Sequence, residues 1–297
     1  MICSTIIPTI GRDTLMQSVQ SALAQDVPAG EYEIIVVNDS GQPLELAAWL
    51  AERGVRVIDA NRCRLNFVCN LGAAVAKGKY LKFLHDDDYL LPGGLRALVE
   101  SAERTGATWV VGGSQVLDDG GGVLFTIDRP GLSGNWFATS VVGEVVHMSD
   151  CLISRQAFME VGGFDPQVKI SEDRDLECRL SLQGDVASTN HVVACVRVSG
   201  SAGSAYDFSN IVIYSRLVRE RAFDAPGAFA RIIDSVRSSA YLRGRTVRGY
   251  LYSGVLNLLA RKVWLAGSRF TCGLRLANWH VVQPAFWRGV FHQQAKH

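Results

Sequence analysis

The cysteines of this 297-residue chain show no pairing pattern. They are seven in number, they are scattered singly, and no two form a CxxC pair: Cys3, Cys63, Cys69, Cys151, Cys178, Cys195 and Cys272. An odd number of isolated cysteines argues against a disulfide framework and against a cysteine-ligated zinc site. We therefore expect reduced thiols and a cytoplasmic location.

Long apolar runs and a strong net charge are also lacking. The best candidate for a membrane span, residues 249–260, runs directly into Arg261 and Lys262, and no window reaches about 18 uncharged apolar residues. The first ten residues carry no basic segment and are interrupted by Pro8, so we expect no signal peptide. A net charge of +1 provides no general attraction to nucleic acid, which we do not expect as a partner.

The two common glycine-rich phosphate loops are missing. The first apolar segment leads into PTIGR, and neither GxGxxG nor GxxxxGK(S/T) follows it. This absence disfavours a conventional dinucleotide-dependent dehydrogenase and a Walker-type nucleotidase.

Apolar segments that suit strands alternate with segments of helical periodicity in the first part of the chain. The expected strands are residues 2–7, 33–37, 55–58 and 80–84, and the expected helices are residues 13–25, 44–53 and 67–77. This alternation predicts βαβ units and a mostly parallel, Rossmann-like sheet flanked by helices.

Polar residues follow three of these strands. They occupy Pro8–Arg12, Asn38–Gly41 and Asp86–Asp88, and the carboxyl ends of parallel strands form the usual ligand-binding edge of such a sheet. Three adjacent aspartates repel one another and need either a cation or open solvent. A ligand site and a solvated acidic turn are the two interpretations of that tripeptide.

The middle of the chain has shorter elements. We expect strands at residues 109–111, 114–117, 123–127, 145–148 and 151–154, with a hairpin turn at 118–122, a loop over 128–143 and a helix over 155–161. A further helix over 172–182 places Glu172 and Asp173 in its first turn, where the helix dipole favours carboxylates.

Five motifs appear in order along the chain: STIIPTIGR, EIIVVNDSG, CNLGAAVAKGKYLKFLHDDDYLLPGGL, VGGFD and SEDRDLECRL. With them the chain resembles the inverting glycosyltransferases of family 2, which have the GT-A fold. The resemblance covers residues 1–200, and we expect a catalytic domain over 1–204 and a helical extension over 205–297.

The resemblance implies a role for each site residue. Asp39 would read the nucleotide base, and Asp86 would face the ribose. Asp87 would hold a Mg²⁺ or Mn²⁺ ion together with the donor diphosphate, since such ions prefer carboxylate and phosphate oxygens. The resemblance assigns to the nucleotide pocket Pro8, Thr9, Arg12 and the weaker candidate Arg64, and to the metal the weaker candidate Asp88.

Asp173 would be the general base, with Glu172 as its neighbour. It would take the proton of an acceptor hydroxyl that attacks the anomeric carbon, and one displacement would invert the configuration. A neighbouring carboxylate raises the pKa of such a base toward neutrality.

His85 departs from the family pattern, because many members carry an aspartate there. Three roles stay open for it: contact with the nucleotide, ligation of the metal, or closure of the strand.

The tail changes composition after the polar segment SGSAGSAY. We expect helices over residues 208–223, 227–242 and 247–270, with a basic bias from Arg216, Arg219, Arg221, Arg231, Arg237, Arg243, Arg245 and Arg248. Packing on the catalytic domain or on a second subunit is one interpretation. Peripheral contact with an anionic membrane is the other, favoured by Trp264, Phe270, Trp279 and Trp287.

The resulting hypothesis is metal-assisted transfer of a sugar from a nucleotide-diphospho-sugar, taken to be a UDP-sugar. The acceptor would be a saccharide, a lipid-linked hydroxyl or another hydroxyl in glycan, polysaccharide or glycolipid assembly. The alternatives are a nucleotidyltransferase that uses the same phosphate and metal site and a degenerate nucleotide-sugar-binding module.

Overall fold

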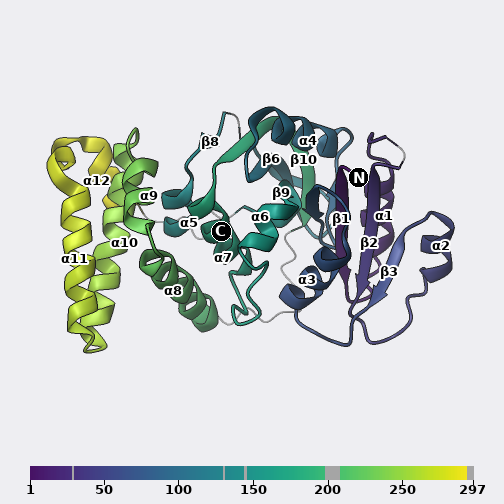
Figure 1. Cartoon of the computed structure of the whole chain (residues 1–297), viewed down its shortest axis with the longest axis horizontal. Coiled ribbons are helices and arrows are strands. Elements are labelled where there is room, and N and C mark those ends of the chain that lie inside the picture. The colour runs from purple at the N-terminus through teal and green to yellow at the C-terminus, as the bar shows by residue number, and fades with distance from the viewer. Residues whose placement is uncertain (29, 130, 144–145, 198–207, 293–297) are drawn as a thin grey trace. The chain divides into compact units, whose positions relative to one another are not determined.

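The computed structural model describes the chain except residues 29, 130, 144–145, 198–207 and 293–297. The chain divides into two compact units, whose elements are labelled in Figure 1. Apart from those gaps, the first unit comprises residues 1–134 and 145–214, and the second comprises residues 135–144 and 215–297. The expected boundary at residue 204 and the segment SGSAGSAY lie outside the described residues.

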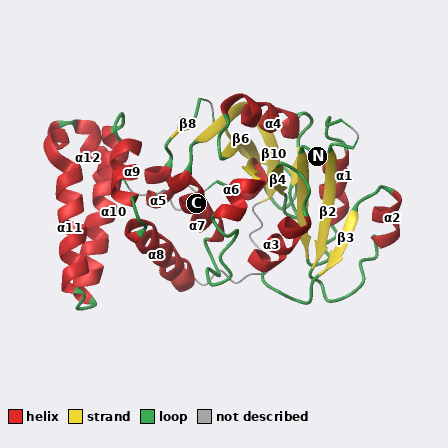
Figure 2. Ribbon diagram, in the orientation of Figure 1, coloured by secondary structure: helices red, strands yellow, loops and turns green. Residues whose placement is uncertain are grey.

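The first part of the first unit alternates strands with helices. Its elements are β1 (Cys3–Thr9), α1 (Leu15–Leu23), β2 (Tyr32–Asn38), α2 (Ala47–Glu52), β3 (Arg56–Asp59), α3 (Leu65–Val75) and β4 (Tyr80–Phe83). The strands pair in parallel in the order β3-β2-β1-β4, and Figure 2 shows helices beside them. Every residue of β1 and β4 is buried, as parallel strands covered on both faces require. The expected α/β fold with a parallel sheet is confirmed.

Beyond β4 the sheet becomes mixed. The remaining elements of this unit are β5 (Tyr89–Leu90), α4 (Gly94–Thr105), β6 (Trp109–Leu117), β7 (Val123–Ile127), β8 (Ser133–Gly134), η1 (Met148–Asp150), β9 (Cys151–Ser154), α6 (Arg155–Glu160), α7 (Glu172–Gln183) and β10 (Val186–Arg197). Strand β9 is antiparallel to β4 and β6, whereas β6 and β10 are parallel. The predicted hairpin turn is present, closed by the Asp118 amide on the Gly122 carbonyl at 2.9 Å.

Strand register brings the ends of β1, β2 and β4 to one edge. Thr9 pairs with Asn38, and Ile6 pairs with Phe83. The residues that follow β2 and β4 therefore leave the sheet at the edge where β1 ends.

Helix α3 approaches this sheet closely through Gly72. A Cβ atom on Gly72 would lie 2.5 Å from Cγ2 of Ile6 and 3.1 Å from Cγ2 of Val37. Any larger residue would push the helix away from β1 and β2, because a close-packed interior has no room to absorb it.

The second unit is helical. It contains α5 (Phe137–Val142), most of α8 (Phe208–Asp224), α9 (Ala228–Ser235), α10 (Ala240–Leu259), α11 (Val263–Ala277), η2 (Asn278–Val282) and α12 (Pro284–Val290). Helix α10 packs against both α11 and α12, and Phe223 stacks on Tyr250 with ring centroids 4.0 Å apart. Within the described residues, no helix combines the length and apolar content that crossing a bilayer requires.

Three expectations in the middle of the chain are wrong. The expected loop over 128–143 contains β8 and α5, and the described part of the expected strand 145–148 is not a strand, since Met148 begins η1. Helix α5 has only six residues, too few to show a helical period, and it is stabilised by α10, which lies about a hundred residues further along the chain. Residues 109–117 form one strand instead of two.

The expected helices 227–242 and 247–270 are broken at other positions. Ser239 begins α10, because its Oγ accepts the Leu242 amide at 3.1 Å. Arg261 adopts a left-handed φ of 60° in the turn between α10 and α11. Neither glycine nor proline marks that turn, so the apolar periodicity continues through it.

Candidate active site

The loop after β1 holds the acidic cluster through Thr9 and Arg12. Thr9 Oγ1 donates to Asp86 Oδ2 at 2.6 Å, and Arg12 Nη1 lies 2.5 Å from Asp86 Oδ1 and 3.3 Å from Asp87 Oδ2. Burial lowers the pKa of Arg12, but the carboxylates of Asp86 and Asp87 outweigh burial and leave that pKa raised. Asp86 is therefore anchored from two sides, and Pro8 lies buried in β1 opposite Val37.

Asp39 lies at the end of β2 and connects two loops. Its amide donates to the Thr9 carbonyl at 2.7 Å, and its Oδ1 accepts the Cys63 amide at 2.6 Å. The buried carboxylate thus fixes the loop that leads to Arg64, the residue that precedes α3. Arg64 itself is exposed.

His85, Asp87 and Asp88 form a second group. One potential ligand atom from each lies within 4.8 Å of the others. Asp88 is buried, with Oδ2 accepting Ser149 Oγ at 2.5 Å and Oδ1 accepting the Arg197 amide at 3.0 Å. Burial raises the pKa of Asp88, and nearby His85 opposes that shift. An imidazole with two carboxylates is a donor set that fits a divalent cation.

A buried lysine, Lys82, holds the segment whose Ser149 contacts Asp88. Lys82 is fully buried in β4, and its Nζ donates to the carbonyls of Ser149 and Cys151. Burial lowers the pKa of Lys82. The lysine ties β4 to the start of β9, which places Ser149 against Asp88. Sequence reasoning missed both Lys82 and Ser149, although a lysine within the apolar run YLKFL is a visible signal.

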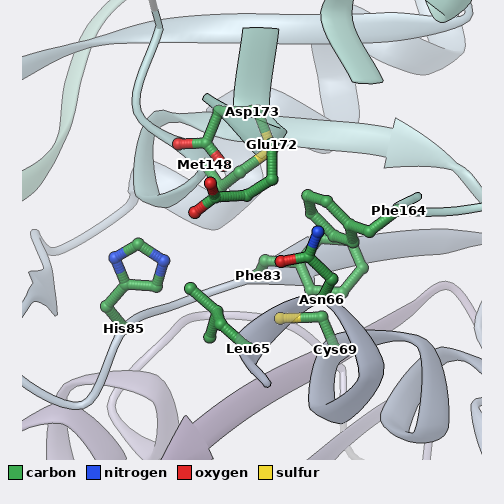
Figure 3. Close-up of a pocket in the computed structure, with 9 residues that line it drawn as sticks. All are labelled: Leu65, Asn66, Cys69, Phe83, His85, Met148, Phe164, Glu172 and Asp173. Atoms are coloured by element: carbon green, nitrogen blue, oxygen red, sulfur yellow. The ribbon is translucent and has the colours of Figure 1, made fainter. Parts of the chain in front are cut away.

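Glu172 and Asp173 open α7 and face a cavity (Figure 3). Their carboxylates lie next to each other and face the same space as the His85 ring. The other lining residues are apolar or neutral: Leu65, Asn66, Cys69, Phe83, Met148 and Phe164. The cavity therefore combines three ionisable side chains with a mostly apolar lining.

Burial raises the pKa of both carboxylates. The pKa of Asp173 rises well above its ordinary value, because repulsion from Glu172 adds to burial. The pKa of Glu172 is raised as well, and nearby His85 opposes the shift. Such an environment makes Asp173 a stronger base than an exposed aspartate.

The turn before α7 is held by two asparagines of α3. Asn70 Nδ2 donates to the Phe164 carbonyl at 2.7 Å, and Asn70 Oδ1 accepts the Phe164 amide at 2.9 Å. Asn66 Nδ2 donates to the carbonyls of Asp165 and Val168, both at 2.7 Å. Sequence reasoning missed these positioning residues, although two amides four residues apart in an apolar helix were a usable signal.

The chain is similar to known glycosyltransferases in sequence. A family model described as Glycosyl transferase family 2 matches residues 4–162, which is more than half of the chain. The succinoglycan biosynthesis protein ExoO of Rhizobium meliloti (strain 1021) is 32% identical over 108 residues, which cover 35% of this chain and 30% of that protein. A glycosyltransferase of Rickettsia bellii (strain RML369-C) is 26% identical over 190 residues, covering 59% of this chain and 26% of that protein. The chain thus spans less than a third of the length of each of these two relatives.

The chain is also similar to solved structures of S. aureus TarS. The structure of TarS 1-349 in complex with UDP-GlcNAc has a TM-score of 0.66 at 14% identity, covering 99% of this chain and 93% of that chain. A longer TarS structure has a TM-score of 0.63 at 15% identity, covering 93% of this chain and 54% of that chain. At such identities the likeness concerns the fold.

Proposed function

The chain belongs to glycosyltransferase family 2 and has the GT-A fold, and we propose that it transfers a sugar from a nucleotide-diphospho-sugar to a hydroxyl acceptor with inversion. The observation that carries this proposal is the cavity that Glu172 and Asp173 face together with His85. A base at one side of a cavity and a cation-binding group at the other suit a displacement between two substrates.

The donor would bind along the edge formed by the ends of β1, β2 and β4. Asp39 offers a carboxylate to a nucleotide base, and the Thr9–Asp86–Arg12 group lies beside it through the contact of Asp39 with Thr9. Asp86 would then face the ribose, with Arg64 and Pro8 contributing from the adjoining loop and strand. These roles are the ones that the resemblance to family 2 implies for the matching residues of this chain.

The divalent cation, Mg²⁺ or Mn²⁺, would be held by Asp87, with Asp88 and His85 as further ligands. When bound, it would neutralise negative charge on the departing diphosphate. Contacts within the chain orient these side chains: Ser149 and the Arg197 amide fix Asp88, and Arg12 contacts Asp87. A ligand atom of His85 lies within 4.8 Å of those of Asp87 and Asp88, so His85 suits ligation better than closure of the strand.

Asp173 would act as the general base. The acceptor oxygen attacks the anomeric carbon and gives its proton to the Asp173 carboxylate. The bond from that carbon to the diphosphate oxygen breaks, and its electron pair leaves with the diphosphate. Burial, together with repulsion from Glu172, holds the pKa of Asp173 high, which favours uptake of the proton.

A UDP-sugar is the proposed donor class, and polysaccharide assembly is the proposed process. The similar fold of TarS, solved with UDP-GlcNAc, supports the first, and the similarity to the succinoglycan biosynthesis protein supports the second. A cytoplasmic location is part of the same proposal, supported by seven free cysteines.

Asp173→Asn tests the proposal directly. The amide keeps the size of the side chain but cannot take a proton, so we expect sugar transfer to fall at least about 100-fold. UDP affinity, measured by calorimetry, should stay within about twofold, since Asp173 is proposed to act on the acceptor. The exposed Glu160→Gln serves as a matched control and should retain activity.

Other outcomes would replace the proposal. Unchanged turnover in Asp173→Asn would exclude the base assignment. Binding of nucleotide sugars by the unaltered chain with no transfer to any hydroxyl acceptor would favour the degenerate binding module. Release of pyrophosphate from a nucleoside triphosphate would favour nucleotidyl transfer.

A further inference from the structure

The turn between α10 and α11 ends a pair of helices that lie side by side (Figure 1). Helix α10 ends at Leu259, α11 begins at Val263, and residues 260–262 connect them. We call residues 252–264 the hairpin tip. Helix α12 packs on the opposite end of α10, where Gly289 contacts Tyr241 and Gly244 contacts Phe286.

The hairpin tip exposes large apolar side chains. Trp264 is 94% exposed, Leu259 is 76% exposed and Val263 is 64% exposed. About half of the surface of three further side chains is exposed: Tyr252, Val255 and Leu258. Six exposed apolar side chains within thirteen residues are unfavourable in water and mark a surface that is covered by another phase or molecule.

The interior beside the hairpin tip is polar. Ser253, Asn257 and Arg269 are buried between the helices of this unit. They converge on Glu220 of α8: Ser253 Oγ donates to Oε1 at 2.5 Å, Asn257 Nδ2 donates to Oε2 at 3.1 Å, and Arg269 Nη2 lies 3.3 Å from Oε2.

In a helix pair that is surrounded by water, apolar side chains lie inside and polar side chains lie outside. At the hairpin tip this arrangement is reversed. Buried hydrogen bonds satisfy the polar groups without solvent, while the outward side chains are those that an acyl environment accepts. The packing therefore points to a lipid surface as the covering phase.

The positive charge of residues 235–297 indicates that the lipid surface is anionic. Residues 235–297 contain no aspartate or glutamate, but they contain ten basic residues: Arg237, Arg243, Arg245, Arg248, Arg261, Lys262, Arg269, Arg275, Arg288 and Lys296. Arg261 and Lys262 are exposed at the turn, next to Leu259 and Trp264. Anionic head groups attract exposed cations such as Arg261 and Lys262 by about 1 kcal/mol each.

The same charges disfavour a second copy of the chain as the occupant. Two hairpin tips in contact would bring Arg261 and Lys262 of each copy together, and residues 235–297 supply no carboxylate to pair with them. We propose that the hairpin tip docks onto an anionic membrane surface, with Trp264 and Leu259 in the interfacial layer and Arg261 and Lys262 on lipid phosphates.

Vesicle flotation of the full chain tests the proposal. We expect the chain to float with vesicles of phosphatidylcholine mixed with phosphatidylglycerol and much less with vesicles of phosphatidylcholine alone. The double variant Leu259→Ser/Trp264→Ser should reduce the bound fraction about tenfold, and Arg261→Gln/Lys262→Gln should remove the preference for the anionic vesicles.

A matched control comes from β7. Val123 and Leu124 are 55% and 57% exposed in the first unit, so Val123→Ser/Leu124→Ser removes exposed apolar surface elsewhere. This control should float like the unaltered chain. All four proteins should show similar thermal unfolding midpoints, because the altered side chains are exposed.

Three results would overturn the proposal. They are no flotation of the unaltered chain, equal flotation with both vesicle types, and equal losses in the hairpin-tip and β7 variants. A dimer seen by sedimentation and abolished by Leu259→Ser/Trp264→Ser, without vesicle binding, would assign the surface to self-association instead. None of these measurements needs donor or transfer, so their failure is distinct from failure of the transferase proposal.

Discussion

The three adjacent aspartates have different environments. Asp86 is anchored by Thr9 and Arg12, Asp88 is buried against Ser149, and Asp87 keeps a partly exposed carboxylate. Like charges this close together are stable only where each has its own partner. Asp87 is thus the carboxylate best placed to gain a ligand.

Asp87→Asn should weaken the effect of a divalent cation on nucleotide binding. We expect Mn²⁺ to increase UDP affinity at least about tenfold in the unaltered chain, and this gain to disappear in the variant, because an amide is a poor ligand for a hard cation. Calorimetry with and without Mn²⁺ measures both values. Asp119→Asn, on the exposed hairpin turn, is the control that should keep the gain. An unchanged gain in Asp87→Asn would contradict the metal assignment.

The raised pKa of Glu177 predicts how the free energy of unfolding depends on pH. Burial raises the pKa of Glu177 to about 8, although the Val146 amide donates to its Oε1 at 2.8 Å. Between the ordinary pKa of a glutamate and about 8, the folded chain holds a proton that the unfolded chain has lost. The free energy of unfolding should therefore fall as pH rises through this range, and then level off.

Glu177→Gln should flatten this part of the profile. The amide oxygen can still accept the Val146 hydrogen bond, and the penalty for a buried charge disappears. We expect the variant to be more stable than the unaltered chain at pH 8, by on the order of a few kcal/mol. Urea unfolding at a series of pH values measures the effect. Parallel profiles for the two proteins would refute it.

At the scale of elements, α3 links the sheet to α7. Gly72 allows α3 to approach β1, and Asn66 and Asn70 hold the turn at residues 163–168. Phe164 of that turn packs edge-on against Phe83 of β4, with ring centroids 5.2 Å apart. The position of Asp173 at the start of α7 therefore depends on contacts made far away in the sequence.

Asn70→Ala should destabilise the turn and slow transfer. Two backbone groups of Phe164 lose their partner, which costs about 1–3 kcal/mol of unfolding free energy. We expect transfer to decline more than UDP affinity, because the turn positions α7 and not the donor edge. Urea unfolding and assays of transfer check the two parts. Asn61→Ala, in an exposed loop, should change neither, and equal effects of both substitutions would disprove the role of the turn.

Local pattern predicted most elements of the first unit because their apolar periodicity is strong. Strand β10 escaped prediction, because Ser188–His191 interrupt its apolar pattern where its register on β6 shifts. The strand forms because β6 supplies a partner for its backbone. Propensity cannot show a partner that is distant in the sequence.

At the scale of the whole molecule, the proposed donor and base residues all belong to the first unit. The second unit has its own polar centre, in which Arg269 Nη2 lies 2.7 Å from Asp224 Oδ1 and 3.3 Å from Glu220 Oε2. We therefore expect a substitution in the polar centre of the second unit to leave donor binding unchanged.

Arg269→Ala should lower the free energy of unfolding without changing UDP affinity. Glu220 loses its charged partner within the helices, and we expect the chain to lose about 2 kcal/mol or more of unfolding free energy. UDP affinity should stay within about twofold, since no proposed donor residue lies in that unit. Thermal unfolding and UDP calorimetry measure the two effects, with the exposed Arg288→Ala as control. A large loss of UDP affinity in Arg269→Ala would contradict this independence.

The sequence by itself determined the fold class, the family and the order of the site motifs, because these depend on local periodicity and on residues that are adjacent in the chain. Only the tertiary structure decided which groups meet. It placed Thr9 and Arg12 on Asp86, Lys82 and Ser149 behind Asp88, and His85 beside the same acidic group. Near the hairpin tip it also turned Ser253 and Asn257 of α10 inward and Val255, Leu258 and Leu259 outward. These arrangements depend on pairing between distant segments, and local propensity does not encode such contacts.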